Sequence, residues 1–321
     1  MNRATAADPA ALRPAHSPRD RRIAESGALM VMVVWAANFI VVKAANHQIP
    51  PIAFAFIRFS LAATVLLVIL RVREGDIAMP RRDLARVLGL GAIGFGLYQV
   101  LWPTALQTIA AGDSALLIAA TPVLTVLLAG VAGSDTLTRA KLAGGLVSFT
   151  GVAIVIATGP GLSLAGSIPG DVLTLAAALC WATYTAFGAS VLRRYSPLRT
   201  TAWAMVGGSV VLAGPGLFQA SGADWGAVSG AAWAGLAYSA ILAAGVANVV
   251  VFHAIKLVGP TPVTALQSFV PFLAVLMGAA FLSEAIRPEQ IVGGVVIILG
   301  VFITRMGAGG IARIRDLLPL E

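Results

Sequence analysis

The chain consists largely of apolar stretches that are each about as long as a bilayer is thick. Short polar connections separate ten such runs, at about 27–45, 52–70, 87–108, 114–132, 140–157, 171–191, 201–219, 231–252, 262–282 and 288–305. A helix needs about 17–25 apolar residues to cross the hydrocarbon core of a membrane. Because no water bonds the backbone there, only helices or closed barrels span it. The runs lack the alternating polarity of barrel strands, so they are predicted to be helices.

Composition excludes an ordinary soluble domain. Of the 321 residues, 58% are hydrophobic and only 11% are charged. A soluble domain carries roughly 25% charged residues. The single cysteine, Cys180, cannot form an internal disulfide, so no oxidising compartment is implied. We therefore predict an all-α polytopic membrane protein with ten transmembrane helices.

The positions of the basic residues predict the orientation of these helices. If the amino terminus is cytoplasmic, 19 of the 22 Lys and Arg residues fall in the termini and in cytoplasmic connections. The outer connections hold only Arg287, while Lys43 and Arg58 lie inside or near the ends of apolar runs. Cytoplasmic loops of membrane proteins are enriched in Lys and Arg. Both termini are thus predicted to be cytoplasmic, and the net charge of +8 is a topology signal, which leaves no reason to expect a nucleic-acid partner.

Two halves of the sequence resemble each other. A spacing of 149 residues aligns Thr121–Leu128 with Val270–Met277, Ser134-Asp135 with Ser283-Glu284, Gly144-Gly145 with Gly293-Gly294, Gly151 with Gly300, and Gln99 with Asn248. Near the start of each half, Trp35 and Pro51 align with Trp181 and Pro197 at a spacing of 146. We predict a first repeat at 26–158 and a second at 170–305, with a disordered cytoplasmic tail at 1–25 and a cytoplasmic tail at 306–321.

Each predicted repeat holds five helices, which is an odd number. The second repeat must therefore enter the membrane upside down relative to the first. The charges agree, since the connection after the second helix has five arginines and its counterpart at 222–230 has none. Inverted repeats let one template present outward-open and inward-open states. This predicts a transporter that works by alternating access.

Several motifs resemble those of a known family. In the first half these are Trp35-Ala36-Ala37-Asn38-Phe39 with Lys43, Arg58-Phe59, Pro122 and Ser134-Asp135; in the second half they are Trp181-Ala182, Pro271 and Ser283-Glu284. Over 26–305 the chain resembles the EamA-type transporters of the drug/metabolite transporter superfamily. It departs from the pattern at Asp135, where Glu is usual, and at Ala36, where Gly is common. The resemblance implies a multi-pass carrier of the bacterial inner membrane that exports amino acids, related metabolites or toxic compounds.

Polar and amphipathic side chains inside the runs are candidates for substrate contact, because each is costly in hydrocarbon without a partner or water. The predicted substrate-binding residues are Trp35, Asn38, Arg58, Tyr98, Gln99, Trp102, Trp181, Tyr184, Asn248 and Gln267. They would form a chamber near the membrane midplane with contributions from both halves. The alternative is purely structural: hydrogen bonds between helices, worth about 0.6 kcal/mol on average, and aromatic packing.

Lys43 and Arg58 each have two interpretations. Lys43 either extends to the outer headgroups or attracts a substrate carboxylate. Arg58 either pairs with an acid such as Glu284, which the topology places on the same side, or attracts that carboxylate. The sequence leaves both questions open.

Three rival functions are less well supported. The histidines are scattered and no buried acid pair is present, so an intramembrane enzyme is not predicted, and no cofactor or metal is expected. A channel would need a ring of like groups. A carrier of phosphorylated or nucleotide-linked sugars would need basic residues at the centre, where only Arg58 is close. The expected partners are a small-molecule substrate and the lipid bilayer, and the sequence carries no signal for an oligomeric state.

Overall fold

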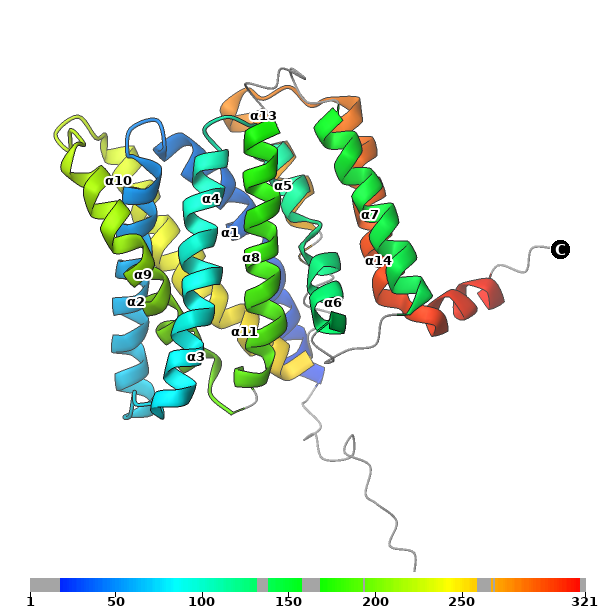
Figure 1. The fold of residues 1–321 in the computed structure, drawn as a ribbon, viewed down its shortest axis with the longest axis horizontal. Coiled ribbons are helices and arrows are strands. Elements are labelled where there is room, and N and C mark those ends of the chain that lie inside the picture. Colours follow the sequence, from blue (N-terminus) through cyan, green and yellow to red (C-terminus); the bar gives the residue numbers. More distant parts are fainter. Residues whose placement is uncertain are drawn as a thin grey trace, which may run out of the picture.

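The computed structural model describes residues 18–131, 138–157, 168–192, 194–258, 267 and 269–317, and this part is a bundle of helices (Figure 1). The first half contains α1 (Pro18–Ala45), α2 (Pro51–Glu74), α3 (Arg81–Gly91), η2 (Ala92–Leu97), α4 (Tyr98–Ala105), α5 (Ala111–Ile118), α6 (Thr121–Val131) and α7 (Arg139–Ala157). The second half contains α8 (Ile168–Leu192), α9 (Pro197–Ser221), α10 (Gly230–Ala237), η3 (Tyr238–Val246), α11 (Ala247–Val258), α13 (Phe269–Leu282) and α14 (Pro288–Leu317).

The prediction of an all-helical chain is confirmed for the described residues. Six of their helical stretches are long and apolar enough to cross a membrane: Ser26–Ala45, Pro51–Glu74, Arg81–Ala105, Ile168–Gly188, Pro197–Ser221 and Gly230–Val251. Shorter apolar helices cover Ala111–Thr125, Phe269–Leu282 and Pro288–Ile303. Residues 1–17 and the predicted match at Ser134-Asp135 lie outside the described residues.

The first helix begins earlier than the sequence predicted. The polar tail was expected to be disordered up to residue 25, but α1 already starts at Pro18. A proline suits the first turn of a helix, because its φ angle is preset and its missing N–H would have no partner there. The helix therefore extends beyond the apolar run on its amino-terminal side.

Two π-helical segments interrupt the third and eighth apolar runs. In the first half η2 spans Ala92–Leu97, and in the second half η3 spans Tyr238–Val246. Shifting η2 by the repeat spacing of 149 residues places it on 241–246, within η3. The two segments end two residues before Gln99 and Asn248, the aligned pair. Short π-helical segments inside α-helices are frequent at functional sites, and the apolar pattern gave no sign of them.

The fourth apolar run is also broken, at Ala119 and Ala120, between α5 and α6. Pro122 has no N–H, so it cannot donate the helical hydrogen bond to the carbonyl of Ile118. The Thr121 hydroxyl donates to that carbonyl instead, at 2.6 Å. The single helix expected at 114–132 is therefore two helices with a turn between them.

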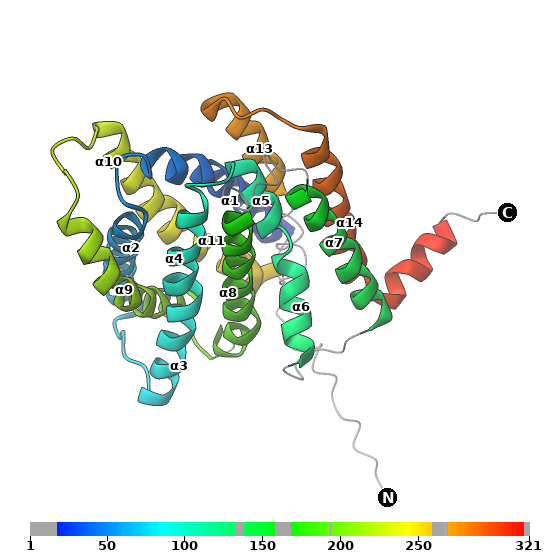
Figure 2. The ribbon, with the colours of Figure 1, turned by 45° about the horizontal axis from the view of Figure 1, so that its top comes forward.

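The two halves pack against each other in a reciprocal way. α2 packs on α9 and α7 packs on α14, and the members of each pair are counterparts in the repeat. α1 contacts α11 and α13 of the second half, while its counterpart α8 contacts α4 and α6 of the first. Figures 1 and 2 both show α7 lying along α14 at one side of the bundle, and both helices also contact α5 and α6. The sequence repeat thus corresponds to a repeat in three-dimensional packing.

The α7–α14 contact shows this relation at the level of single residues. A Cβ atom on Gly151 would meet the backbone of Gly293 and Ile297, and one on Gly300 would meet the backbone of Gly144 and Ser148. Shifting each residue of the first contact by 149 positions gives its partner in the second. Glycine at both positions lets the two backbones approach closely.

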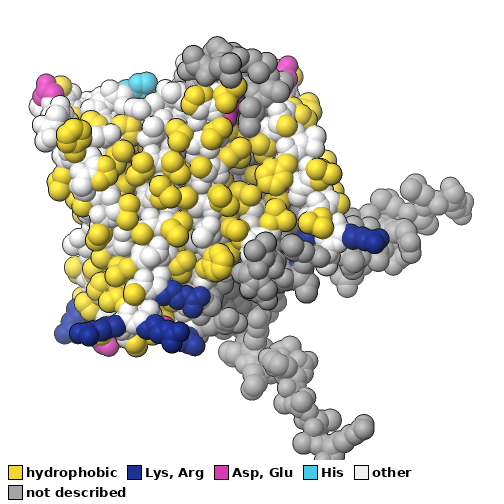
Figure 3. Space-filling model, in the orientation of Figure 1, with side chains coloured by type: hydrophobic (Ala, Val, Ile, Leu, Met, Phe, Trp, Pro, Cys, Tyr) yellow, Lys and Arg dark blue, Asp and Glu magenta, His cyan; other side chains and the backbone are white. Residues whose placement is uncertain are grey.

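The outer surface is an apolar band with a basic edge. Figure 3 shows hydrophobic side chains over most of one face, with Lys and Arg gathered at the end where α2 connects to α3. Large apolar side chains such as Phe218 and Phe281 are 80% and 76% exposed. Apolar surface of this extent suits contact with lipid rather than water.

Candidate functional site

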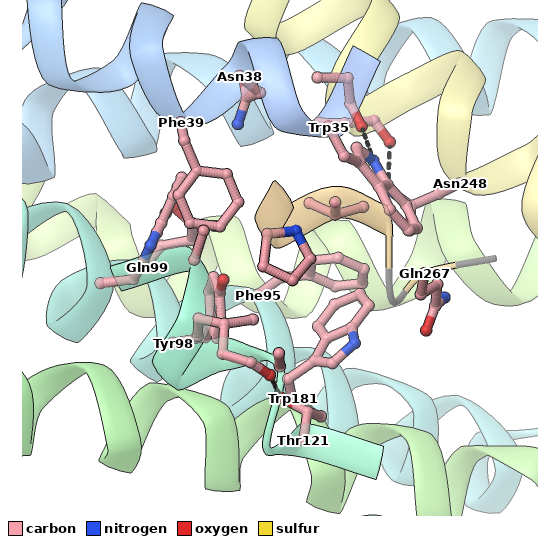
Figure 4. Close-up of a pocket in the computed structure, with 18 of the residues that line it drawn as sticks. Trp35, Asn38, Phe39, Phe95, Tyr98, Gln99, Thr121, Trp181, Asn248 and Gln267 are labelled. Atoms are coloured by element: carbon pink, nitrogen blue, oxygen red, sulfur yellow. Dashed lines mark hydrogen bonds between the residues drawn. The ribbon is translucent and has the colours of Figure 1, made fainter. Parts of the chain in front are cut away.

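A cavity lies between the two halves, within the bundle. It measures about 980 Å³ including the part open to solvent. It is lined by Trp35, Asn38, Phe39, Arg58, Phe59, Phe95, Tyr98, Gln99, Trp102, Ala115, Ile118, Ala119, Thr121, Trp181, Ala243, Ala244, Asn248, Gln267, Val270 and Pro271. In Figure 4, Trp35 and Asn38 enter the space from α1 and Trp181 enters from α8 on the opposite side.

The structure brings most of the residues singled out in the sequence together in this wall. All of them line the cavity except Tyr184. Tyr184 is buried behind the wall, where its ring centroid lies 5.0 Å from that of Phe95 and 5.4 Å from that of Trp181. Trp181 and Tyr184 lie three residues apart on α8 and share one helix face, but only Trp181 reaches the cavity.

Sequence reasoning missed much of the apolar lining. Phe95 lies three residues before Tyr98, so helical spacing places both on one face and offered a signal. Phe59 adjoins Arg58, and Phe39 was quoted only as part of a motif. Ile118, Ala119 and Thr121 had no signal, because they line the cavity only through the break between α5 and α6.

Backbone carbonyls of the π-helical segment η3 take part in the hydrogen bonding of the wall. The Trp35 indole donates to the carbonyl of Ala243 at 3.1 Å. The Asn248 amide donates to the carbonyl of Ala244 at 2.8 Å. The side-chain oxygen of Asn38, Oδ1, accepts a hydrogen bond from the Ser239 hydroxyl at 2.6 Å. These bonds fix the side chains of α1 and α11 against η3.

Aromatic rings form one side of the cavity. The centroid of the Trp181 ring lies 5.6 Å from that of Phe95 and 5.9 Å from that of Tyr98. Tyr98 in turn lies 5.8 Å from Trp102, whose indole donates to the Ser114 hydroxyl at 3.1 Å. Such offset and edge-on pairs are favourable aromatic geometries, so this wall is a preformed apolar surface.

Arg58 is the charged residue among the described lining side chains. It is 5% exposed, and its Nε donates to the carbonyl of Ser239 at 3.2 Å. Its guanidinium carbon lies 4.9 Å from the centroid of the Phe59 ring. Its Nη1 is buried without a hydrogen-bond partner. The interpretation that Arg58 pairs with Glu284 is therefore wrong.

Glu284 binds Lys43 instead. The Lys43 ammonium donates to Glu284 at 2.9 Å and to the carbonyl of Ile109 at 2.7 Å. The backbone N–H groups of Ala111 and Gly112, at the start of α5, donate to the same carboxylate at 3.0 and 3.4 Å. Lys43 therefore does not extend to the headgroups, because its partners are inside the protein.

A second ion pair lies beside the first. Arg287 Nη2 donates to both carboxylate oxygens of Asp113 at 2.7 Å, and the Gln290 amide donates to one of them at the same distance. We call Lys43, Glu284, Asp113, Arg287 and Gln290 the charged cluster. It joins α1, α5 and the segment from α13 to α14 at the end of the bundle opposite the basic edge (Figures 1 and 3).

The described part of the cavity wall is mostly apolar and uncharged. No acidic side chain lines the cavity among the described residues. In the same part of the chain, no group of three His, Cys, Asp or Glu side chains is arranged to hold a metal ion. What the cavity offers is amide groups, aromatic rings and one buried guanidinium.

Comparison with known proteins identifies relatives among membrane transporters. An uncharacterised transporter of Bacillus subtilis is 28% identical over 284 residues, which are 87% of this chain and 90% of that protein. A probable terminal-alkyne amino-acid exporter of Streptantibioticus cattleyicolor is 28% identical over 86% of this chain and 91% of its own. A probable amino-acid metabolite efflux pump of Salmonella typhimurium is 33% identical, over 53% of this chain and 54% of its own.

A solved crystal structure and a family profile complete the comparison. The crystal structure superposes with a TM-score of 0.63 at 17% identity, over 90% of this chain and 98% of the other, and this likeness shows the fold alone. The EamA-like transporter family matches residues 22–157 and again 168–306. The two matches cover most of the chain and repeat in tandem, so the chain belongs to the EamA-like transporter family.

Proposed function

We propose that this protein exports small metabolites, either amino acids and related compounds or toxic small molecules, by alternating access. The observation that carries this proposal is the cavity, because side chains from both halves line it. Carriers built from inverted repeats bind their substrates at the interface between the repeats, where helices are discontinuous. Here the break between α5 and α6 opens onto the cavity.

We further propose that the protein crosses the bacterial inner membrane ten times. The repeats at 26–158 and 170–305 would be inverted relative to each other, with the tails at 1–25 and 306–321 in the cytoplasm. In this orientation the basic edge of the bundle faces the cytoplasm and the charged cluster faces outward. Two of the relatives are named for amino-acid compounds, which supports this substrate class.

A carrier for phosphorylated sugars is less well supported by the cavity. A phosphate group carries up to two charges and needs several donors. The described wall offers one basic side chain for this purpose, Arg58.

Counterflow in proteoliposomes tests the transport activity. Purified protein is reconstituted into proteoliposomes that are loaded with unlabelled solute. A labelled tracer of the same solute is then added outside. A carrier gives saturable, transient tracer accumulation, whereas a channel gives a current that rises linearly with voltage. The panel contains amino acids and neutral, cationic or toxic solutes. The proposal would be refuted if none of them gave saturable counterflow.

Single substitutions test whether the cavity is the binding chamber. Asn38→Leu, Gln99→Leu and Asn248→Leu each remove a polar group from the wall. Each should slow counterflow about two- to tenfold, the effect of one lost hydrogen bond. Gln107→Leu is the matched control, since Gln107 is exposed and lies outside the cavity. Normal transport by all three variants, with normal expression, would show that the substrate binds elsewhere.

A further inference from the structure

Two polar atoms in the cavity wall lack partners. Arg58 Nη1 and Gln99 Oε1 are both buried and make no hydrogen bond. Arg58 is 5% exposed and Gln99 is 3% exposed, so bulk water is largely excluded from both. Elsewhere in the wall, Trp35 Nε1, Asn38 Oδ1 and Asn248 Nδ2 make hydrogen bonds within the protein. Arg58 Nη1 and Gln99 Oε1 are thus a donor and an acceptor in the wall that a bound molecule could pair with.

The unpaired guanidinium nitrogen carries the greater energetic cost. A buried charge is expensive unless it is paired and hydrogen-bonded. The Phe59 ring and the carbonyl of Ser239 satisfy Arg58 only in part. The titratable group close enough to act on its charge is Tyr98, and no carboxylate is close to it among the described residues. An anionic group on the substrate would supply the missing partner.

The planar guanidinium of Arg58 favours a carboxylate as its partner. A guanidinium presents its N–H groups in a planar fork that matches the two oxygens of a carboxylate. A guanidinium already holds a carboxylate within this protein, since Arg287 Nη2 donates to both oxygens of Asp113 in the charged cluster. One arginine balances one negative charge, so a singly charged carboxylate fits better than a doubly charged phosphate.

The remaining wall specifies the rest of the substrate. The side-chain oxygen of Gln99, Oε1, is an acceptor and needs an N–H donor, which an ammonium group provides. The rings of Phe95, Tyr98 and Trp181 offer apolar surface and also attract a cation through their faces. Resting on the proposed transport function, we propose that the substrate is an α-amino acid with an apolar side chain, whose carboxylate binds Arg58 and whose ammonium binds Gln99.

Matched pairs of solutes test the carboxylate without altering the protein. Leucine and phenylalanine are compared with leucinamide, phenylalaninamide and phenethylamine as competitors of counterflow in proteoliposomes. The amino acids should compete at concentrations about 10- to 100-fold lower than the amides and the amine, since a charge-assisted hydrogen bond is lost. Equal or better competition by the amides would overturn the proposal, and so would preference for a phosphate ester.

Substitution of Arg58 tests the residue itself. Arg58→Met keeps much of the length and removes the charge, so it should abolish the preference for acid over amide. Arg58→Lys retains the charge and should retain part of the preference. Arg71→Met is the control, because Arg71 lies at the exposed end of the same helix, and it should behave as the unmodified protein. An unchanged acid preference in Arg58→Met would refute the assignment.

The outcomes separate this proposal from the one on which it rests. Saturable counterflow of any solute without an acid preference refutes the role of Arg58 and leaves the transport function standing. Absence of saturable counterflow for every solute refutes the transport function. If Arg58→Met does not fold, as judged by gel filtration, the acid-against-amide comparison on the unmodified protein still decides.

Discussion

The charged cluster is expected to keep one end of the cavity closed, and Glu284→Gln tests this. Glu284 is held by Lys43 at 2.9 Å and by the backbone N–H groups of Ala111 and Gly112 at 3.0 and 3.4 Å. These contacts tie α1, α5 and the end of α13 together. Buried apolar side chains, including Val42, pack between these same helices. Opening this end requires that the contacts of the carboxylate break.

The size of the effect follows from these contacts. Glutamine keeps one oxygen to accept from the start of α5 but loses the charge that binds Lys43. A hydrogen bond to a charged group contributes about 1.5–3 kcal/mol, and we take about 2 kcal/mol because both side chains are slightly exposed. Their exposed fractions are 19% and 17%. Since 1.4 kcal/mol corresponds to a factor of ten, the population open at this end should rise about 30-fold.

Cysteine labelling from outside intact cells measures this population. The single native cysteine is replaced by Cys180→Ala, and a reporter is introduced as Ala115→Cys in the cavity wall. A membrane-impermeant maleimide should label the reporter up to about 30-fold faster in Glu284→Gln, and Lys43→Met should act in the same direction. Glu289→Gln, an exposed acid on α14, is the control. Labelling rates that stay within about twofold of the background in both cluster variants would refute the closing role.

Two further predictions concern stability in detergent. Gly300→Ala brings a methyl group against the backbone of Ser148, so it should cost about 1–3 kcal/mol and lower the melting temperature. The control is Gly214→Ala, whose methyl group would meet no atom within 4 Å and should not lower the melting temperature. Equal melting temperatures of the two variants would contradict the close packing at Gly300. The hydrogen bond from the Tyr195 phenol to Asp83, at 2.6 Å, raises the pKa of that phenol. Its stabilisation should be complete below the ordinary phenol pKa of about 10 and lost as the pH rises through the raised value. Tyr195→Phe should thus lower the melting temperature equally from neutral pH to about pH 9 and by less above pH 10, and a deficit that grows there would contradict this.

The sequence by itself determined the class of the protein. Long apolar runs predict membrane helices, because the backbone must bond itself in hydrocarbon, and six of the described helical stretches are long and apolar enough to span. The spacing of 149 residues identified Gly151 and Gly300 as equivalents, and the structure places them in reciprocal contacts of α7 with α14. These properties are written in local composition and in repetition, so they can be derived without knowing how the helices pack.

The sequence also identified most of the polar side chains of the cavity wall, since polar groups inside apolar runs are few and costly. Trp35, Asn38, Gln99 and Asn248 all line the cavity as grouped. It gave no indication of the π-helical segments η2 and η3.

Only the tertiary structure decided which charges pair. The sequence offered Arg58 as a partner of Glu284, yet Lys43 binds this carboxylate across 241 positions of the chain. Ser283 adopts a positive φ of 55° at the end of α13, which turns Glu284 back toward α5. Ion pairs depend on the distance between side chains from remote segments and on the local turn that aims them, and neither is encoded in hydropathy or spacing. For this reason the structure alone shows that Arg58 faces the cavity with a nitrogen left unpaired.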